Sequence, residues 1–227
     1  DPASYGLNIS GHEKGSSTKN DGTVIMTNSY VECRYLVNKG TLKVIGNGTV
    51  GATPNLVVLG GFDVCGRPAN ETESGENATA TMELSNGAYV QIKNINGLGV
   101  GREGNGVLSV RDGSKFEHNW ANGEFLNLAN GTVNIDVSSL FVGQKMNNAG
   151  TIAIDATGIT APVKVIDCTN SGATDLAGYG TVTVTGGEAY VDDGDLWVNV
   201  LYVAQIGDEK YATFADAIEA AEAYAAE

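Results

Sequence analysis

One pattern occurs twice between Leu98 and Asp155, and it limits what this chain can fold into. Each copy has a short apolar run that ends in Val-Gly, a polar turn rich in Gly and Asn, and an alternating strand. The two strands are Val107–Val110 and Thr151–Ile154. A short unit with Gly at its corners and strands of period two buries its apolar face only by stacking on neighbouring units. The pattern therefore predicts a β-solenoid.

Further alternating strands along the chain indicate the size of the unit. They begin near residues 41, 81, 107, 132, 151 and 181, and several of the spacings fall near 19 to 26 residues. That length is typical of one coil of a parallel β-helix, whereas a propeller blade needs about 40 residues or more. We expect about eight coils, which at about 4.8 Å per coil would make a rod about 40 Å long.

Two segments interrupt the strands and have separate interpretations. Residues 1–20 are polar and turn-rich, and we expect an irregular cap there, because an open solenoid end exposes unpaired strand edges. Residues 63–79 are acidic and contain Pro68, and they predict a loop excursion from the solenoid wall. A long loop on a rigid scaffold can carry function, but a tolerated insertion is the simpler interpretation.

The chain ends in a different pattern. Apolar side chains recur at helical spacing and share one helix face: Phe214, Ala217, Ile218, Ala221 and Tyr224. We therefore divide the chain into a solenoid over residues 1–202 and a strand with an amphipathic helix over 203–227. The helix could close the C-terminal end of the solenoid.

Composition excludes several kinds of partner. The chain has 13 Lys and Arg against 27 Asp and Glu, so its net charge is −14. Such a chain gains no counterion release from nucleic acid and has no general attraction to anionic membranes. No run of 18 or more apolar residues occurs, so we expect no membrane insertion of this segment.

The three cysteines, Cys33, Cys65 and Cys168, are widely spaced and form no C-x-x-C motif. This spacing excludes a zinc ribbon. Buried, reduced thiols are the simplest interpretation, because free Cys is among the most buried residue types. A bridge between Cys33 and Cys65 stays open if the two residues lie on adjacent coils.

The unit from Leu98 to Gly113 reads L-x-V-G-x-x-G-x-G-x-L-x-V-x-x-G. It resembles repeats of right-handed parallel β-helices in bacterial surface and autotransporter-passenger proteins of the pectin-lyase-like superfamily. The resemblance covers most of residues 41–200 and concerns architecture only. It implies an all-β fold, a single-stranded right-handed parallel β-helix with a short C-terminal α-helix.

Residues 203–221 resemble the segment that opens pectin-lyase-like modules in long surface proteins of gut bacteria. In those proteins the strand and helix cap the first coil of the next module. The resemblance implies that 203–227 is either a cap for this solenoid or the start of a following module. Other modules of the same chain would then be among its partners.

Carboxylates near the end of the strands are the best candidates for a cation site. Polysaccharide lyases on this fold hold calcium with such a cluster, and calcium takes six to eight oxygen ligands. Asp193 and Asp195 could share a strand face. A solvated turn between Val191 and Leu196 is the simpler interpretation, and the repeated calcium-binding nonapeptide is absent. We assign no catalytic residue, metal or cofactor.

Aromatic residues supply the second candidate site. Phe116, His118 and Trp120 alternate along one strand and would share a face. An exposed Trp-His face could stack on a sugar, although such a stripe is more often core packing. Arg102 and Arg111 lie near Glu103 and Asp112, a pattern typical of weak surface ion pairs.

These observations predict a non-catalytic structural or adhesive module of a secreted or cell-surface bacterial protein. A rigid rod would display loops such as 63–79 to a host or bacterial surface protein or glycan. The alternative is a glycan-binding or polysaccharide-degrading β-helix, in which case acidic, basic and aromatic side chains should gather on one wall. An inert spacer is a third hypothesis. No G-x-S-x-G motif occurs, which argues against a serine hydrolase of that type.

Overall fold

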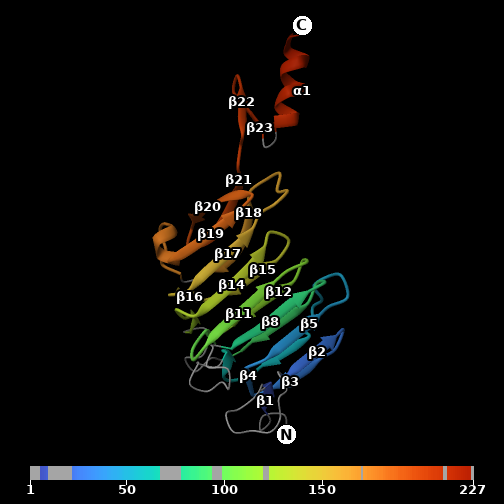
Figure 1. Cartoon of the computed structure of the whole chain (residues 1–227), viewed down its shortest axis with the longest axis vertical. Helices are drawn as coiled ribbons and strands as arrows, with labels where there is room; N and C mark the ends of the chain where they lie inside the picture. The colour runs from blue at the N-terminus through green and yellow to red at the C-terminus, as the bar shows by residue number, and fades with distance from the viewer. Residues whose placement is uncertain are drawn as a thin grey trace.

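The computed structural model describes residues 6–9, 22–66, 78–93, 99–119, 123–169, 171–211 and 214–225, and it consists mostly of parallel β-sheet. The chain passes through three sheets in turn, so that each strand from β1 to β15 pairs with the strand three places later. Figure 1 shows the resulting stack, which rises from the first strands to the last.

We call the three sheets A, B and C, and one passage of the chain through them a coil. Each coil contributes one strand to each sheet. Sheet A contains β1 (Gly6–Ile9), β4 (Tyr35–Asn38), β7 (Phe62–Val64), β10 (Gly99–Val100), β13 (Glu124–Asn127) and β16 (Lys145–Asn148). Sheet B contains β2 (Thr23–Thr27), β5 (Thr41–Ile45), β8 (Thr79–Ser85), β11 (Asn105–Val110), β14 (Gly131–Asp136), β17 (Thr151–Asp155) and β19 (Thr181–Thr185). Sheet C contains β3 (Val31–Cys33), β6 (Leu56–Val58), β9 (Tyr89–Ile92), β12 (Lys115–His118), β15 (Leu140–Gly143), β18 (Val163–Cys168), β21 (Asp195–Val200) and β20 (Gly187–Asp192).

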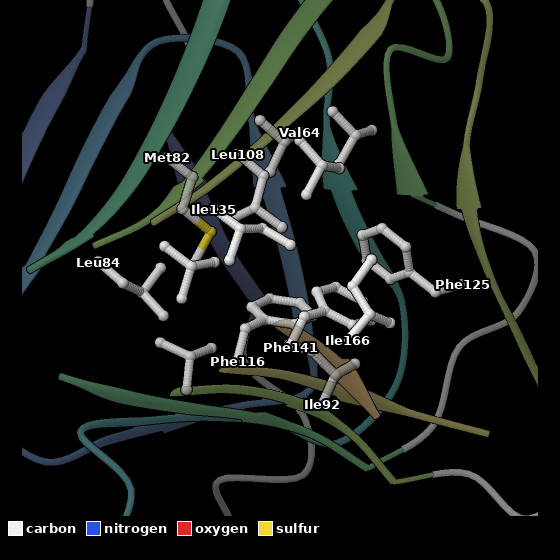
Figure 2. Close-up of a cluster of buried hydrophobic side chains, with 14 of the residues drawn as sticks. Val64, Met82, Leu84, Ile92, Leu108, Phe116, Phe125, Ile135, Phe141 and Ile166 are labelled. Atoms are coloured by element: carbon white, nitrogen blue, oxygen red, sulfur yellow. The ribbon is translucent and has the colours of Figure 1, made fainter. Parts of the chain in front are cut away.

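Side-chain alternation explains why these strands stack. In sheet B the register aligns inward-facing residues of successive coils, and each of them is fully buried: Leu42, Met82, Leu108, Val133 and Ile152. Sheet C contributes Phe116 and Phe141, and sheet A contributes Phe125. The ring of Phe141 lies 5.1 Å from that of Phe116 and 4.9 Å from that of Phe125, centroid to centroid. Figure 2 shows this core, which runs through the coils.

Asparagine side chains, buried at Asn127 and half-buried at Asn148, form the corner between sheets A and B. Asn127 donates from Nδ2 to the carbonyl of Thr151 at 3.0 Å, and Asn148 donates to that of Tyr179 at 2.7 Å. Each amide thereby links its coil to the next. A glycine follows because the corner is tight: a Cβ on Gly150 would lie 2.3 Å from the carbonyl oxygen of Gly131.

The predicted loop excursion over 63–79 is wrong at its two ends. Asp63 and Val64 belong to β7, and Thr79 begins β8. Asp63 and Cys65 are buried, so this stretch is part of the coil wall. A strand with a buried carboxylate lacks the alternation that marks its neighbours, which is why the sequence pattern missed it. Residues 67–77 lie outside the described residues.

The stack ends in an antiparallel hairpin, where we expected further parallel coils. Strands β20 and β21 pair with each other, and β21 pairs antiparallel with β18. Asp193 and Gly194 connect them, both with positive φ (49° and 84°). An Asp-Gly pair is favoured in a two-residue hairpin turn, which reverses the chain. Among the described residues sheet B has seven strands, which at about 4.8 Å per strand make about 34 Å of stacking rather than the expected 40 Å.

The C-terminal helix forms as predicted but does not cover the last coil. Helix α1 (Phe214–Ala225) packs on a small hairpin of β22 (Ala204–Ile206) and β23 (Glu209–Tyr211). Figure 1 places this pair beyond the coils. Among the described side chains of α1, only Ala217 is buried. Within the described residues, no helix combines the length and the apolar character that a membrane crossing needs.

Candidate functional site

His118 lies inside the core and presents no surface to a ligand. It is 1% exposed on β12, and its ring lies 6.4 Å from that of Phe125. Among the described residues, neither ring nitrogen has a hydrogen-bond partner. Burial lowers its pKa to about 4, so the imidazole is neutral at pH 7. The predicted sugar-stacking role is therefore wrong for His118, and Trp120 lies outside the described residues.

Asp193 and Asp195 differ in their surroundings. Asp193 is exposed in the hairpin turn. Asp195 accepts the Cys168 N–H at 2.9 Å and forms an ion pair with Lys164. Asp195 is thus held by partners of its own, and the expectation that the two carboxylates share a face stays a prediction. Across the part of the chain that is described, no three His, Cys, Asp or Glu side chains are grouped to hold a metal ion.

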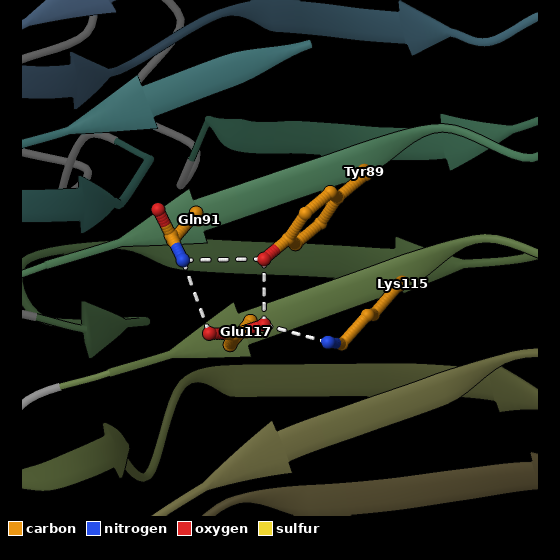
Figure 3. Close-up of polar contacts among 4 residues, drawn as sticks. All are labelled: Tyr89, Gln91, Lys115 and Glu117. Atoms are coloured by element: carbon orange, nitrogen blue, oxygen red, sulfur yellow. Dashed lines mark hydrogen bonds and ion pairs between the residues drawn. The ribbon is translucent and has the colours of Figure 1, made fainter. Parts of the chain in front are cut away.

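The outer face of sheet C carries a polar cluster of Tyr89, Gln91, Lys115 and Glu117, drawn in Figure 3. One carboxylate oxygen of Glu117 accepts from the Tyr89 hydroxyl and from Lys115 Nζ, both at 2.6 Å. The other accepts from Gln91 Nε2 at 3.1 Å. Burial pushes the Glu117 pKa up, but these three hydrogen bonds outweigh it and hold the pKa below its usual range. Burial and the bond to Glu117 raise the pKa of Tyr89.

A second cluster on the same face lies near the C-terminal hairpin. The register places Lys164, Trp197 and Tyr190 side by side on β18, β21 and β20. Lys164 Nζ lies 5.3 Å from the centre of the Trp197 ring, and the Tyr190 ring lies 6.4 Å away on the other neighbouring strand. Trp197 is therefore flanked by its neighbours on both sides. In the first cluster both carboxylate oxygens of Glu117 have donors, whereas in the second the Trp197 Nε1–H is buried and has no hydrogen-bond partner among the described residues.

A groove of about 510 Å³ lies on the outer face of sheet B. Its polar lining includes Arg111, Asn134, Asp136, Asp155 and Thr183. Asp136 accepts from the Asp112 N–H at 2.7 Å, so this carboxylate also braces a turn. Hydrogen bonds from Thr157 lower the pKa of Asp155, and the nearby Arg111 charge adds to the effect. The groove offers a cation, carboxylates, an amide and hydroxyls on one face, a set suited to hydrogen-bonding a polyol.

The thiols are free and buried, as expected, and no Cys33–Cys65 bridge exists. Burial raises the pKa of Cys65 to about 12, and the neighbouring Asp63 carboxylate adds to this. A thiol with so high a pKa is no nucleophile at neutral pH. Lys39 pairs with Glu103 at 3.0 Å and, together with the nearby Arg102 charge, lowers the pKa of Glu103. Arg102 also lies 3.8 Å from Asp63.

The sequence pattern did not anticipate either cluster on sheet C or the groove on sheet B. Each joins residues of separate coils, and coil length varies: aligned positions are 25 residues apart for Gly113 and Ser138 but 40 apart for Thr41 and Thr81. Without the register, no spacing rule connects Tyr89 with Glu117. Only the inward-facing apolar positions, which pair between neighbouring coils, follow a pattern that can be recognised in the sequence.

Comparison with known proteins finds no matching family model, no matching curated protein and no matching solved structure. The resemblance to pectin-lyase-like repeats therefore rests on the motifs between Leu98 and Gly113 and over 203–221. The three stacks of parallel strands are compatible with a β-helix.

Proposed function

We propose that this chain is a non-catalytic structural and adhesive module of a secreted or cell-surface bacterial protein. Its coils form a right-handed parallel β-helix that acts as a stiff rod. Connections between the strands face a partner, a host or bacterial surface protein or glycan. Other modules of the same chain attach at its ends.

The observation that carries this proposal is the continuous core under continuous hydrogen-bonded ladders. Every coil contributes buried side chains to one cluster that extends from Met26 to Val198. Backbone hydrogen bonds between parallel strands run along the axis of the stack. A coil cannot leave this arrangement without exposing the apolar faces of both neighbours. Such a body resists bending and proteolysis, which suits a spacer between a surface and a partner.

The polar clusters also support a structural role. Glu117 and Asp195 are each held by a lysine and a further hydrogen-bond donor. A catalytic carboxylate needs a free oxygen beside the substrate. These carboxylates instead cross-link neighbouring strands, where cross-strand pairs contribute to sheet stability.

The test uses the whole chain and a panel of plant, host and bacterial polysaccharides, with and without calcium. We expect no new reducing or unsaturated ends in any mixture. We also expect subtilisin to cut only outside the strands and to leave the coils as one folded body by circular dichroism. New chain ends on any polymer, or rapid digestion through the strands, would contradict the proposal.

A glycan-binding rod is the second candidate, and the groove on sheet B favours it. A sugar chain lying across β14, β17 and β19 would meet Arg111, Asn134 and Thr183. Retention of the protein on one polymer of the panel, without cleavage, is the expected result. Arg111→Ala should then reduce retention at least fivefold. Lys43→Ala, on the same sheet but away from the groove, is the matched control and should leave retention unchanged.

A further inference from the structure

The three sheets end at β16, β20 and β19, and these last strands differ in how their outer edges are protected (Figure 1). Unpaired strand edges accept further chain segments, so proteins usually cover such an edge or place charges on it. In sheet A, β16 adjoins the 3-10 helix η3 (Leu176–Tyr179), where Asn148 donates to the Tyr179 carbonyl at 2.7 Å. In sheet C, β20 carries exposed Glu188 and Asp192. In sheet B, β19 has no charge, and among the described residues no strand pairs with its outer edge.

The backbone of β19 presents open hydrogen-bonding groups along this edge. The Thr185 carbonyl accepts the Ala156 N–H at 2.8 Å, so the backbone groups of the threonines face the preceding coil. The N–H and C=O of one residue in a parallel strand point to the same side, and successive residues alternate. The backbone groups of Val182 and Val184 therefore point away from β17, toward a position that a further strand could take.

The side chains of the same two valines leave the end of the core incompletely covered. Val182 is in register with Ile152 and Val184 with Ile154, and these isoleucines are 0% and 3% exposed. Both valines, by contrast, are only half-buried. A further strand with apolar side chains on its inner face would bury them and pair with their backbone at once. The surface at the end of sheet B is therefore suited to a β-strand.

Strand β19 is complementary to a second copy of itself. Its sequence, Thr-Val-Thr-Val-Thr, is the same in both directions. An antiparallel pair centred on Thr183 places Thr183 opposite Thr183 of the second copy, and Val182 opposite Val184 of the second copy. Each valine pair then exchanges backbone hydrogen bonds in both directions. Thr–Thr pairs and pairs of β-branched side chains stabilise neighbouring strands, and the pairing brings no charged side chain of β19 into contact.

A two-fold axis normal to sheet B also fits the stepped end of the molecule. Among the described residues, sheets A, B and C contain six, seven and eight strands, so the stack is shortest at sheet A and longest at sheet C. Rotation about this axis reverses the stack and exchanges its two sides. The longer side of each copy thus meets the shorter side of the other. The C-terminal hairpin of β22 and β23 follows β21 of sheet C, and neither of its strands pairs with β19.

We propose that β19 pairs antiparallel with β19 of a second copy of this chain, forming a two-fold dimer of two rods joined end to end. The same surface of both copies forms the interface, so association stops at the dimer. One pair of five-residue strands buries less than the roughly 1,600 Å² of a standard interface, so the dimer is weak and forms at high protein concentration. This goes beyond the proposed rod function and does not depend on it.

Sedimentation velocity of the whole chain, over a concentration series up to about 1 mM, tests the proposal. We expect the weight-average mass to approach that of a dimer and not to exceed it. Because each copy has a net charge of −14, added salt screens the repulsion between copies and should strengthen their association. A wild-type chain that stays monomeric, that grows beyond a dimer or that associates less in salt would overturn the proposal.

Thr183 provides charge variants, because it is exposed and lies on the two-fold axis. Thr183→Lys and Thr183→Glu each place two like charges opposite one another, so each should weaken self-association about tenfold or more. An equimolar mixture of the two places opposite charges there and should restore a mixed dimer. Thr79→Lys, at an exposed threonine of sheet B in a middle coil, is the matched control and should associate like the wild type.

Val184→Pro tests the backbone pairing separately. Proline removes the N–H that faces the second copy and no hydrogen bond to β17, and an edge strand tolerates proline at such a position. We expect an unchanged circular dichroism spectrum and association weaker by about tenfold or more. Undiminished association of Val184→Pro or of either Thr183 variant would overturn the proposal. A mixture of the Thr183 variants that stays monomeric, or an equal loss with Thr79→Lys, would do so as well.

Discussion

Replacing His118 by Leu should make the protein more stable, and most of all in mild acid. The folded state holds the imidazole neutral, with a pKa of about 4, whereas an unfolded chain has a His pKa of about 6.5. Between these values the unfolded state binds more protons, so stability falls as pH falls through this window. At about 1.4 kcal/mol per pH unit, His118 costs the wild-type protein about 3 kcal/mol by pH 4.

The Leu side chain changes two terms. It removes the protonation penalty, and it also replaces two unpartnered ring nitrogens that cost about 1–3 kcal/mol at any pH. We therefore expect His118→Leu to raise the free energy of unfolding by about 1–3 kcal/mol at pH 7.5. At pH 4.5 this difference from the wild type should be larger by up to about 3 kcal/mol. Carboxylates with lowered pKa values, such as Glu117, weaken both proteins alike at still lower pH.

The assay is urea unfolding followed by far-ultraviolet circular dichroism at pH 7.5, 6.5, 5.5 and 4.5. The free energy of unfolding should decrease more steeply with falling pH in the wild type than in His118→Leu. His12→Gln, at the other histidine, serves as the control and should keep the wild-type slope. Equal slopes for wild type and His118→Leu, or a His118 resonance that titrates near 6.5, would refute the reasoning.

Three substitutions test the coil architecture by urea unfolding at pH 7.5. Asn127→Ala removes a buried corner amide and should lower the free energy of unfolding by about 2–3 kcal/mol. Asn147→Ala, at an exposed amide, is the control and should lower it by less than about 0.5 kcal/mol. Equal losses would contradict the corner role. Gly150→Ala forces a Cβ against the backbone and should lower the free energy of unfolding by more than about 2 kcal/mol. Gly158 has positive φ but open space around it, so Gly158→Ala should cost about 1 kcal/mol. The reverse order would be evidence against the close approach at Gly150. Phe141→Ala should cost about 3–5 kcal/mol, and a cost below about 1 would rule out the packed aromatic core.

The existence of most strands follows from local chemistry, so the sequence predicts it well. Alternation of period two marks inward and outward faces, as at Thr151–Asp155. Gly and Asn at the corners meet the need for tight turns that other residues strain to form. The helix over Phe214–Ala225 is equally local. The burial of Asp63 was not predicted, because one carboxylate in so short an apolar run makes the run look like a loop.

Strand direction and cross-strand contacts depend on which segments meet, and local sequence does not specify that. The alternation of Leu196–Val200 would suit a parallel or an antiparallel strand equally. In the sequence, only the Asp193–Gly194 pair indicates a hairpin. The acidic residues on both sides of this pair obscured that indication. The Glu117 cluster likewise depends on the register between β9 and β12.

By itself, the sequence determined that this chain forms short two-faced strands with tight corners, because backbone preference and side-chain period act over a few residues. The tertiary structure alone decided where the stack ends, that His118 lies unpartnered in the core, and that Tyr89 meets Glu117 across two strands. Those outcomes depend on burial and on pairing between distant segments. The physical reason is that coil length varies, so position along the chain does not fix position in the stack.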